Sequence, residues 1–362
     1  MFNFTINYNN PQNGATALFN GNISETSWNT LNTDTSTRSY LYSYDPLNRL
    51  VSAIDNTGEY SVGNITPISY DLNGNILKMQ RKRVIDADDN FTYTYDNGNK
   101  LMSLSGSITG SFTYDANGNM KKDTRKGIDD ITYNHLNLPT RVDFGTNRLE
   151  YTYDATGNRL RKKKVENGTP ITIDYTGKFV YKNNELQYFA HPEGYVEYVS
   201  NTDSWKYIYK YTDHLKNVRL SYTDNNNDGI ITPSTEIIEE NNYYPFGLKH
   251  KGYNTVTQPI GNSVAQKKGY ANKELEEDLG LNTIAYGWRD YDPALARFNK
   301  IDRFAEKYKN NSPYNFTLNN PINYPEIAGD SINLKLIIRH DRNEGTNYAQ
   351  QIVDDLTKVT GL

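Results

Sequence analysis

A short turn sequence that recurs along the first half of the chain constrains the fold more than any other feature. Tyr-Asp or Tyr-Asn occurs six times in register, with spacings of 26, 25, 19, 19 and 20 residues. The clearest copies continue as Tyr-Asp-x-x-Gly-Asn. In such a turn Asp accepts hydrogen bonds from the backbone ahead of it, and Gly-Asn adopts positive φ. The opening tyrosines are Tyr44, Tyr70, Tyr95, Tyr114, Tyr133 and Tyr153.

The residues before each turn alternate between apolar and polar side chains. Phe91, Tyr93 and Tyr95, for example, alternate with Thr92 and Thr94, which is the period of a half-buried strand. A second strand follows each turn, so each repeat predicts a β-hairpin. Because the turns agree in register, the sequence predicts an all-β fold in which the hairpins form a long, strongly twisted antiparallel sheet.

Composition and charge exclude several kinds of protein. The 31 Tyr outnumber the 12 Phe, and mean hydropathy is −0.80, so tyrosine must supply much of the buried area. A net charge of −4 does not suggest a nucleic-acid partner, and the absence of cysteine excludes disulfides. No apolar run is long enough for a membrane span, and residues 1–10 do not resemble a signal peptide.

These repeats resemble the YD repeats of Rhs proteins, of insecticidal toxin complexes and of teneurins. Beyond them, the motifs are similar to those of the Rhs-associated core and occur in family order, although Lys216 stands where the family usually has Gly. The resemblance covers about residues 40–329 and implies a sheet that spirals into a hollow shell around cargo. The core motifs include Asp213-His214-Leu215-Lys216-Asn217-Val218-Arg219, Tyr243-Tyr244-Pro245-Phe246-Gly247, Trp288-Arg289-Asp290-Tyr291-Asp292-Pro293 and Asn319-Asn320-Pro321.

The resemblance also predicts how the chain is divided. Residues 1–39 are expected to form an N-terminal flank, 40–173 the YD repeats, and 174–329 the Rhs-associated core with a small mixed plug. Residues 330–362 would begin a truncated, variable C-terminal domain, which is frequently a toxin in the family. Their pattern predicts a strand and an amphipathic helix in a short α/β tail that is poorly anchored to the shell.

Arg289, Asp290 and Asp302 are the candidate catalytic residues. Two carboxylates held together can share a proton, so that one acts as a base towards water and the other as an acid. The resemblance implies that these residues form an intramolecular aspartyl protease that releases the C-terminal domain. The alternative is a structural Arg–Asp network that closes the shell.

The cleavage region departs from the family pattern. Asp-Pro-x-Gly followed by an apolar residue is usual, whereas here the aligned stretch is Glu326-Ile327-Ala328-Gly329-Asp330. The missing proline removes a fixed φ, and Asp330 brings a third negative charge towards the two aspartates. With Gly329 and Asp330 in a degenerate cleavage region, we expect self-cleavage to be weak or absent.

A candidate calcium loop is the only cofactor site that the sequence suggests. Asp224, Asn226 and Asp228, followed by Gly229, match the front half of an EF-hand-type loop, but the expected glutamate is one residue late, at Glu236. The alternative is a polar hairpin turn.

Two further groups of residues are expected to be structural. The basic run Lys162–Lys164 is predicted to be a solvated strand end. His214, in the core motif, is predicted to be a hydrogen-bonded structural residue rather than a metal ligand.

These features predict a structural function. The chain is expected to be a segment of the encapsulating shell of a polymorphic-toxin-type Rhs protein, secreted or at the cell surface as part of a larger chain. Its partners would be its own C-terminal toxin and an upstream shell segment. The alternative is a cell-surface adhesin that binds glycans through exposed repeat tyrosines. No enzyme acting on an external substrate is evident.

Overall fold

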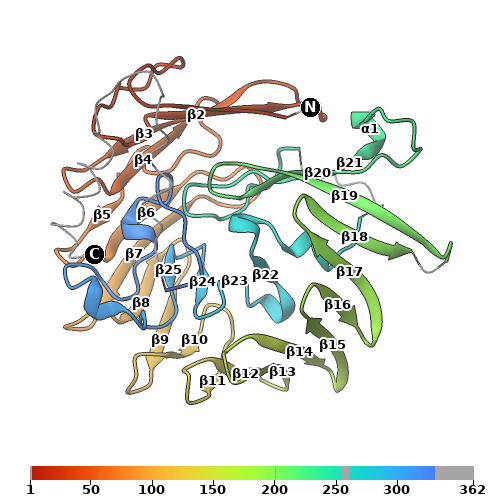
Figure 1. The fold of residues 1–362 in the computed structure, drawn as a ribbon. Coiled ribbons are helices and arrows are strands. Elements are labelled where there is room, and N and C mark those ends of the chain that lie inside the picture. Colours follow the sequence, from red (N-terminus) through yellow and green to blue (C-terminus); the bar gives the residue numbers. More distant parts are fainter. Residues whose placement is uncertain (1, 200, 255–260, 331–362) are drawn as a thin grey trace.

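The computed structural model describes residues 2–199, 201–254 and 261–330, which form antiparallel strands joined by short turns (Figure 1). Strands that are consecutive in the sequence lie side by side in the sheets. The first sheet contains β1 (Phe2–Asn7), β2 (Glu25–Thr30), β3 (Arg38–Tyr44) and β4 (Leu50–Asp55). The second contains β5 (Ser69–Tyr70), β6 (Ile76–Arg81), β7 (Asp89–Tyr95), β8 (Leu101–Gly106), β9 (Gly110–Tyr114) and β10 (Met120–Asp123).

The third sheet is the largest, with 11 strands, and the fourth is small. The third contains β11 (Asp130–Tyr133), β12 (Pro139–Phe144), β13 (Asn147–Tyr153), β14 (Arg159–Glu166), β15 (Thr169–Thr176), β16 (Phe179–Lys182), β17 (Glu185–His191), β18 (Gly194–Val199), β19 (Ser204–Thr212), β20 (Val218–Tyr222) and β21 (Ile237–Glu240). The fourth contains β22 (Glu274–Glu276), β23 (Thr283–Ala285), β24 (Asp290–Asp292) and β25 (Arg297–Phe298). Apart from five short 3₁₀ turns, the helix among the described residues is α1 (Pro233–Glu236).

The Asp-x-x-Gly-Asn turns have the predicted geometry. The Asp71 carboxylate accepts the backbone N–H groups of Asn73 at 2.9 Å and Asn75 at 2.8 Å, and its second oxygen accepts the Asn75 side-chain amide at 2.8 Å. Gly74 has a φ of +79°, a conformation that residues with a side chain rarely adopt. The turns at Asp115 and Asp154 use the same Asp–Asn contacts.

The repeat tyrosines connect each hairpin to the one before it. Each ring packs partly buried against the main core, and in four of the six repeats its hydroxyl donates to a backbone carbonyl at the start of the return strand in the preceding repeat. This contact explains why the motif needs tyrosine rather than phenylalanine. The hydroxyl-to-carbonyl pairs are Tyr70 to Leu50 at 2.5 Å, Tyr95 to Ile76 at 2.8 Å, Tyr133 to Met120 at 2.6 Å and Tyr153 to Pro139 at 3.0 Å.

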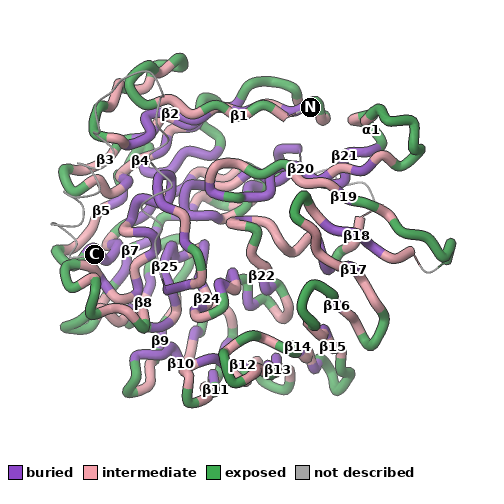
Figure 2. The backbone as a smooth tube through the Cα atoms, in the orientation of Figure 1, coloured by how far each residue is buried: buried purple, intermediate pink, exposed green. Residues whose placement is uncertain are grey.

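The first three sheets form a curved wall, and residues 242–254 and 261–330, drawn in teal and blue, lie inside it (Figure 1). We call these two described stretches, 242–254 and 261–330, the plug. Buried residues concentrate where the wall and the plug meet (Figure 2). Tyr291 and Phe298 of the plug are 0% exposed, and the Tyr291 ring stacks on Phe316 with centroids 3.9 Å apart. The hydrophobic core therefore joins wall and plug into one unit.

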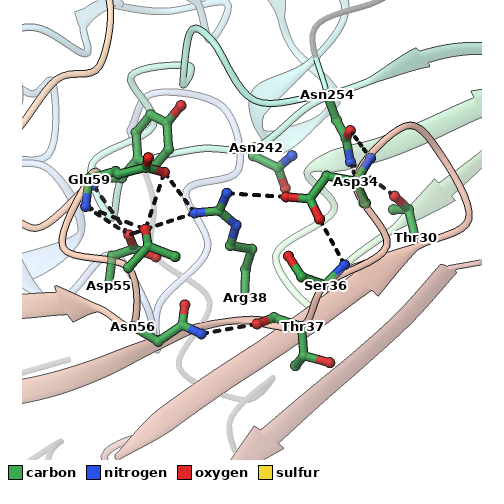
Figure 3. Close-up of polar contacts among 12 residues, drawn as sticks. Thr30, Asp34, Ser36, Thr37, Arg38, Asp55, Asn56, Glu59, Asn242 and Asn254 are labelled. Atoms are coloured by element: carbon green, nitrogen blue, oxygen red, sulfur yellow. Dashed lines mark hydrogen bonds and ion pairs between the residues drawn. The ribbon is translucent and has the colours of Figure 1, made fainter.

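The first sheet also contacts the far end of the third sheet. The Thr30 hydroxyl donates to Glu240 of β21 at 2.8 Å. In the loop between β2 and β3, the Asp34 backbone N–H donates to Asn254 of the plug at 2.8 Å. Arg38 lies beside this contact and pairs with Asp34 at 3.3 Å (Figure 3). Residues of the N-terminal flank thus lie in the same sheet as the first repeat and help to close the wall around the plug.

The all-β prediction is confirmed, and backbone pairing adds a detail to it by dividing the wall into three sheets. Between β4 and β5, Val62 forms isolated bridges to both Ala53 and Arg81. Between β10 and β11 the turn instead directs Arg125 and Lys126 towards the plug, where both pair with Asp292. The strand and helix expected after Ser331 lie outside the described residues.

None of the helices in the described part of the chain has the length and apolar character that crossing a membrane requires.

Candidate functional site

Arg289 is the centre of the candidate site, directly before β24. Its Nη2 group donates to the Asp302 carboxylate at 2.6 Å and its Nη1 group to the Pro313 carbonyl at 3.1 Å. Its Nε group donates to the carbonyl of Gly329. The guanidinium also lies 3.6 Å from the centre of the Phe298 ring, and the side chain is buried. Arg289 therefore joins the candidate carboxylate Asp302 to the expected cleavage region.

Asp330 lies in the same cluster, near Asp302. Its buried carboxylate pairs with Arg303, whose guanidinium lies 3.9 Å from the Trp288 ring centre. Burial raises the pKa of the Asp302 carboxyl and Asp330 adds to that rise, while Arg289 opposes it. Arg303 was not among the site residues predicted from the sequence; its position directly after Asp302 was the available signal.

Asp290 belongs to a different environment. It is the first residue of β24 and follows Arg289 directly. Burial raises the pKa of the Asp290 carboxyl, and the charges that act on it are those of Arg159, Glu276, Lys300 and Lys126. The charges that act on Asp302 come from a separate set of residues.

The structure therefore brings together part of the candidate set. Arg289, Asp302, Gly329 and Asp330 form one cluster. Within the described ranges, no hydrogen bond or ion pair joins Asp290 to Asp302. In this conformation the arrangement holds a backbone carbonyl beside one arginine-bound carboxylate, rather than presenting two carboxylates that share a proton.

The candidate calcium loop uses its oxygen atoms within the loop. Asp224 accepts the backbone N–H groups of Asp228 at 3.2 Å and Gly229 at 2.9 Å, and the Asn226 amide donates to Asp228 at 2.9 Å. The buried Glu236 accepts backbone N–H groups at both ends of the loop. Among the residues that the structure describes, no group of three His, Asp or Glu side chains could hold a metal ion.

Comparison with known proteins identifies the family. The family model described as "Teneurin YD-shell" matches residues 12–229, which is more than half of the chain. The chain belongs to the teneurin YD-shell family. A search of curated proteins finds no match.

Solved structures support the same fold. The crystal structure of TcdB2-TccC3-TEV is 17% identical with a TM-score of 0.54, and the match covers 91% of this chain. A Photorhabdus luminescens Tc holotoxin pore with a mutant TccC3 is 16% identical with a TM-score of 0.51, over 90% of this chain. The chain spans 18% of the length of each of these proteins, so the likeness shows that it has the fold of an Rhs/YD-repeat shell and nothing beyond the fold.

The core motif that contains His214 is itself a turn of the YD-shell type. Asp213 accepts the backbone N–H groups of Leu215 and Asn217, both at 3.0 Å, and the Asn217 side-chain amide at 2.9 Å. Tyr243 donates to the Val218 carbonyl at 3.3 Å, as the repeat tyrosines do. His214 contacts the Ile322 carbonyl of the plug at 2.8 Å through Nε2, which agrees with its expected structural role.

Lys216 occupies the glycine position of this turn, with a φ of +64°. A left-handed backbone conformation costs an L-residue about 1–2 kcal/mol, and glycine does not have this cost. Glycine has a larger conformational entropy in the unfolded chain, which offsets only part of the gain. Lys216→Gly should therefore stabilise the protein by about 0.5–1 kcal/mol. Lys216→Ala keeps the strain and should give no gain. Thermal unfolding of the three proteins tests this, and a lower melting temperature for Lys216→Gly would contradict it.

Wall and plug are also joined by buried ion pairs, and here one expectation was wrong. Lys162 is not solvated: it is 2% exposed and pairs with Glu274 at 2.8 Å, Glu276 at 3.0 Å and Asp278 at 3.1 Å. Arg159, in the same strand, also pairs with Glu276. The basic run Lys162–Lys164 was expected to be solvated. The expectation failed because the three plug carboxylates that pair with Lys162 are far from it in the sequence.

Proposed function

We propose that the chain is a section of an encapsulating shell that holds its own C-terminal polypeptide, a toxin, as cargo. The observation that carries the proposal is the contact of Arg289 with the Gly329 carbonyl, because it fixes the last described residues of the plug inside the wall. The Lys162 cluster and the Asp292 ion pairs hold the plug itself.

The encapsulation is tested by electron microscopy of the protein produced from the complete reading frame. A hollow shell with internal density is the expected result. A compact sandwich without a lumen would contradict the proposal.

The adhesin alternative receives less support. It requires solvent-facing tyrosines in the repeats, whereas Tyr95, Tyr114 and Tyr153 are partly buried and pack against the main core. Because these rings pack against the core of the wall, little of their aromatic area is accessible to a glycan.

We further propose that the Arg289–Asp302 cluster is the remnant of a self-cleaving aspartyl protease whose activity is weak or absent. Three features support the loss of activity: the separate environments of Asp290 and Asp302, the buried charge of Asp330, and Ile327 in place of proline. A loss of about 1.4 kcal/mol of transition-state stabilisation slows a reaction tenfold, so two or three such losses convert prompt cleavage into slow cleavage.

Intact-mass spectrometry of the freshly purified protein tests this proposal. We expect the mass of the uncleaved chain to dominate. The double variant Ile327→Pro with Asp330→Leu restores the proline and the apolar residue of the family pattern and should be cleaved faster, and adding Asp302→Asn should stop that cleavage. A dominant wild-type species that ends near Gly329 or Asp330 and disappears in Asp302→Asn would establish an active protease and overturn the proposal.

A further inference from the structure

The outward side of β19 is a row of aromatic side chains. Its inward side packs on the plug, where Ile208 is 0% exposed. Because side chains alternate along a strand, every second residue from Trp205 onward faces away from the plug. Strand pairing places residues of β18 and β20 beside them, with Tyr222 opposite Tyr209. The outward residues of β19 are Trp205, Tyr207, Tyr209 and Tyr211.

Ring contacts extend this row across neighbouring strands. Phe189 of β17 lies 5.7 Å from Trp205 and 5.5 Å from Phe179 of β16, and Tyr222 lies 5.6 Å from Tyr209 (all centroid distances). We call this surface the aromatic face. Its main residues are Phe179, Phe189, Trp205, Tyr207, Tyr209 and Tyr211.

The aromatic face is open to solvent, unlike the repeat tyrosines. Trp205 is 51% exposed, Tyr207 56%, Tyr211 39% and Phe179 44%. Burial of such rings is favourable, and contiguous exposed apolar surface on a soluble protein marks an interaction site. Four exposed rings beside one another are therefore a candidate binding surface.

The aromatic face also lacks lysine and arginine. The outward positions of β17, β18, β19 and β20 carry neither, whereas the same side of the sheet at β13 and β14 carries Arg161 and Lys163. A carboxylate, that of Asp203, lies at its margin and accepts the Tyr198 hydroxyl at 2.9 Å beside Trp205. Nucleic acids and anionic lipid surfaces bind through basic side chains, so neither matches this surface.

Exposed area argues against a protein partner. With each ring contributing on the order of 100 Å², the four exposed rings offer roughly 400 Å², about half of the ~800 Å² that each partner buries in a stable protein interface. A row of rings that carry hydroxyl groups, with few aliphatic side chains, instead suits a ligand that is itself a row of small, uncharged, hydroxylated rings.

We propose that the aromatic face binds an uncharged polysaccharide. The face of a pyranose ring presents C–H groups to the negative π-face of an aromatic ring, while its hydroxyl groups remain at the edge for water or tyrosine. Trp205 to Tyr211 spans about 20 Å along an extended strand, enough for several consecutive sugar rings. This site follows the YD repeats in the sequence, and binding there does not depend on whether the shell holds a C-terminal toxin.

The test uses the whole chain and a panel of insoluble neutral polysaccharides: cellulose, xylan, chitin and mannan. We expect retention by at least one of them, reduced at least tenfold by Trp205→Ala and by Tyr207→Ala. Tyr207→Phe keeps the ring and should retain binding. Tyr8→Ala is the matched control, because Tyr8 is also exposed, at 38%, but lies outside the aromatic face. Circular dichroism confirms that each variant is folded.

Three outcomes would overturn the proposal. The first is no retention on any neutral polysaccharide, and the second is retention that Trp205→Ala leaves unchanged. The third is concentration-dependent dimerisation in sedimentation that Trp205→Ala abolishes, which would assign the face to a second copy of the chain. In a Trp288→Phe background, a soluble oligosaccharide from a retained polymer should also shield Trp205 from iodide quenching, because the remaining tryptophan, Trp28, is buried at 4% exposure.

Discussion

Replacing Tyr95 with alanine is expected to lower the free energy of unfolding by about 3–5 kcal/mol, the range for removing a packed aromatic ring. The substitution removes the ring from the core and leaves the Ile76 carbonyl without its 2.8 Å hydrogen bond. Because that bond joins two consecutive hairpins, the effect should appear in the unfolding of the wall as a whole. Chemical denaturation followed by near-ultraviolet circular dichroism measures it.

Two controls divide the effect into its parts. Tyr95→Phe keeps the ring and removes only the hydroxyl, so it should cost about 1–2 kcal/mol for the unpaired buried carbonyl. Thr94→Ala changes the exposed side of the same strand and should stay within about 0.5 kcal/mol. The same comparison applies at Tyr153, whose hydroxyl donates to Pro139, and the alanine variant alone is compared at Tyr114. Costs below about 1 kcal/mol at two of the three tyrosines would show that these rings do not hold the wall together.

The sequence predicted those parts of the fold that short-range geometry determines. The Asp71 turn needs only residues within four positions of one another, and the alternation around Tyr95 needs only the two-residue period of a strand. Both could be seen in the sequence. Lys216 concealed one further turn of the same kind, because the motif was defined with glycine at that position.

The sequence could not show contacts between wall and plug. Lys162 and Glu276 are 114 residues apart, and Arg125 and Asp292 are 167 apart, so only the folded chain brings them together. In the candidate site, too, the sequence predicted the residues but not their arrangement in space. Sequence resemblance identified Arg289, Asp290 and Asp302, but the direction of each side chain depends on how β24 and the segments beside it fold within the plug.

Replacing Glu276 with alanine should destabilise the protein by about 3–5 kcal/mol, because removing one partner of a buried ion pair leaves its counter-charge uncompensated. Glu276 is 1% exposed and pairs with both Arg159 and Lys162. The matched control is Glu166→Ala in the same strand as Lys162. Glu166 pairs with Lys164 at 2.8 Å, but its side chain is 46% exposed, and an exposed pair contributes about 0–1 kcal/mol.

The Glu276 contribution should also depend on pH in a defined direction. Burial alone would raise the pKa of the Glu276 carboxyl, but Arg159 and Lys162 outweigh burial and hold that pKa below its usual range. The folded state therefore binds the proton more weakly than the unfolded chain, whose glutamate pKa is about 4.3. The stabilisation is fully present above that value and is lost as the pH falls below it. Between about pH 6 and pH 3, the melting temperature of the wild type should fall more steeply than that of Glu276→Gln, since only the wild type loses this carboxylate by protonation. Parallel curves for the two proteins would show that the ion pairs of Glu276 do not hold the plug in the wall.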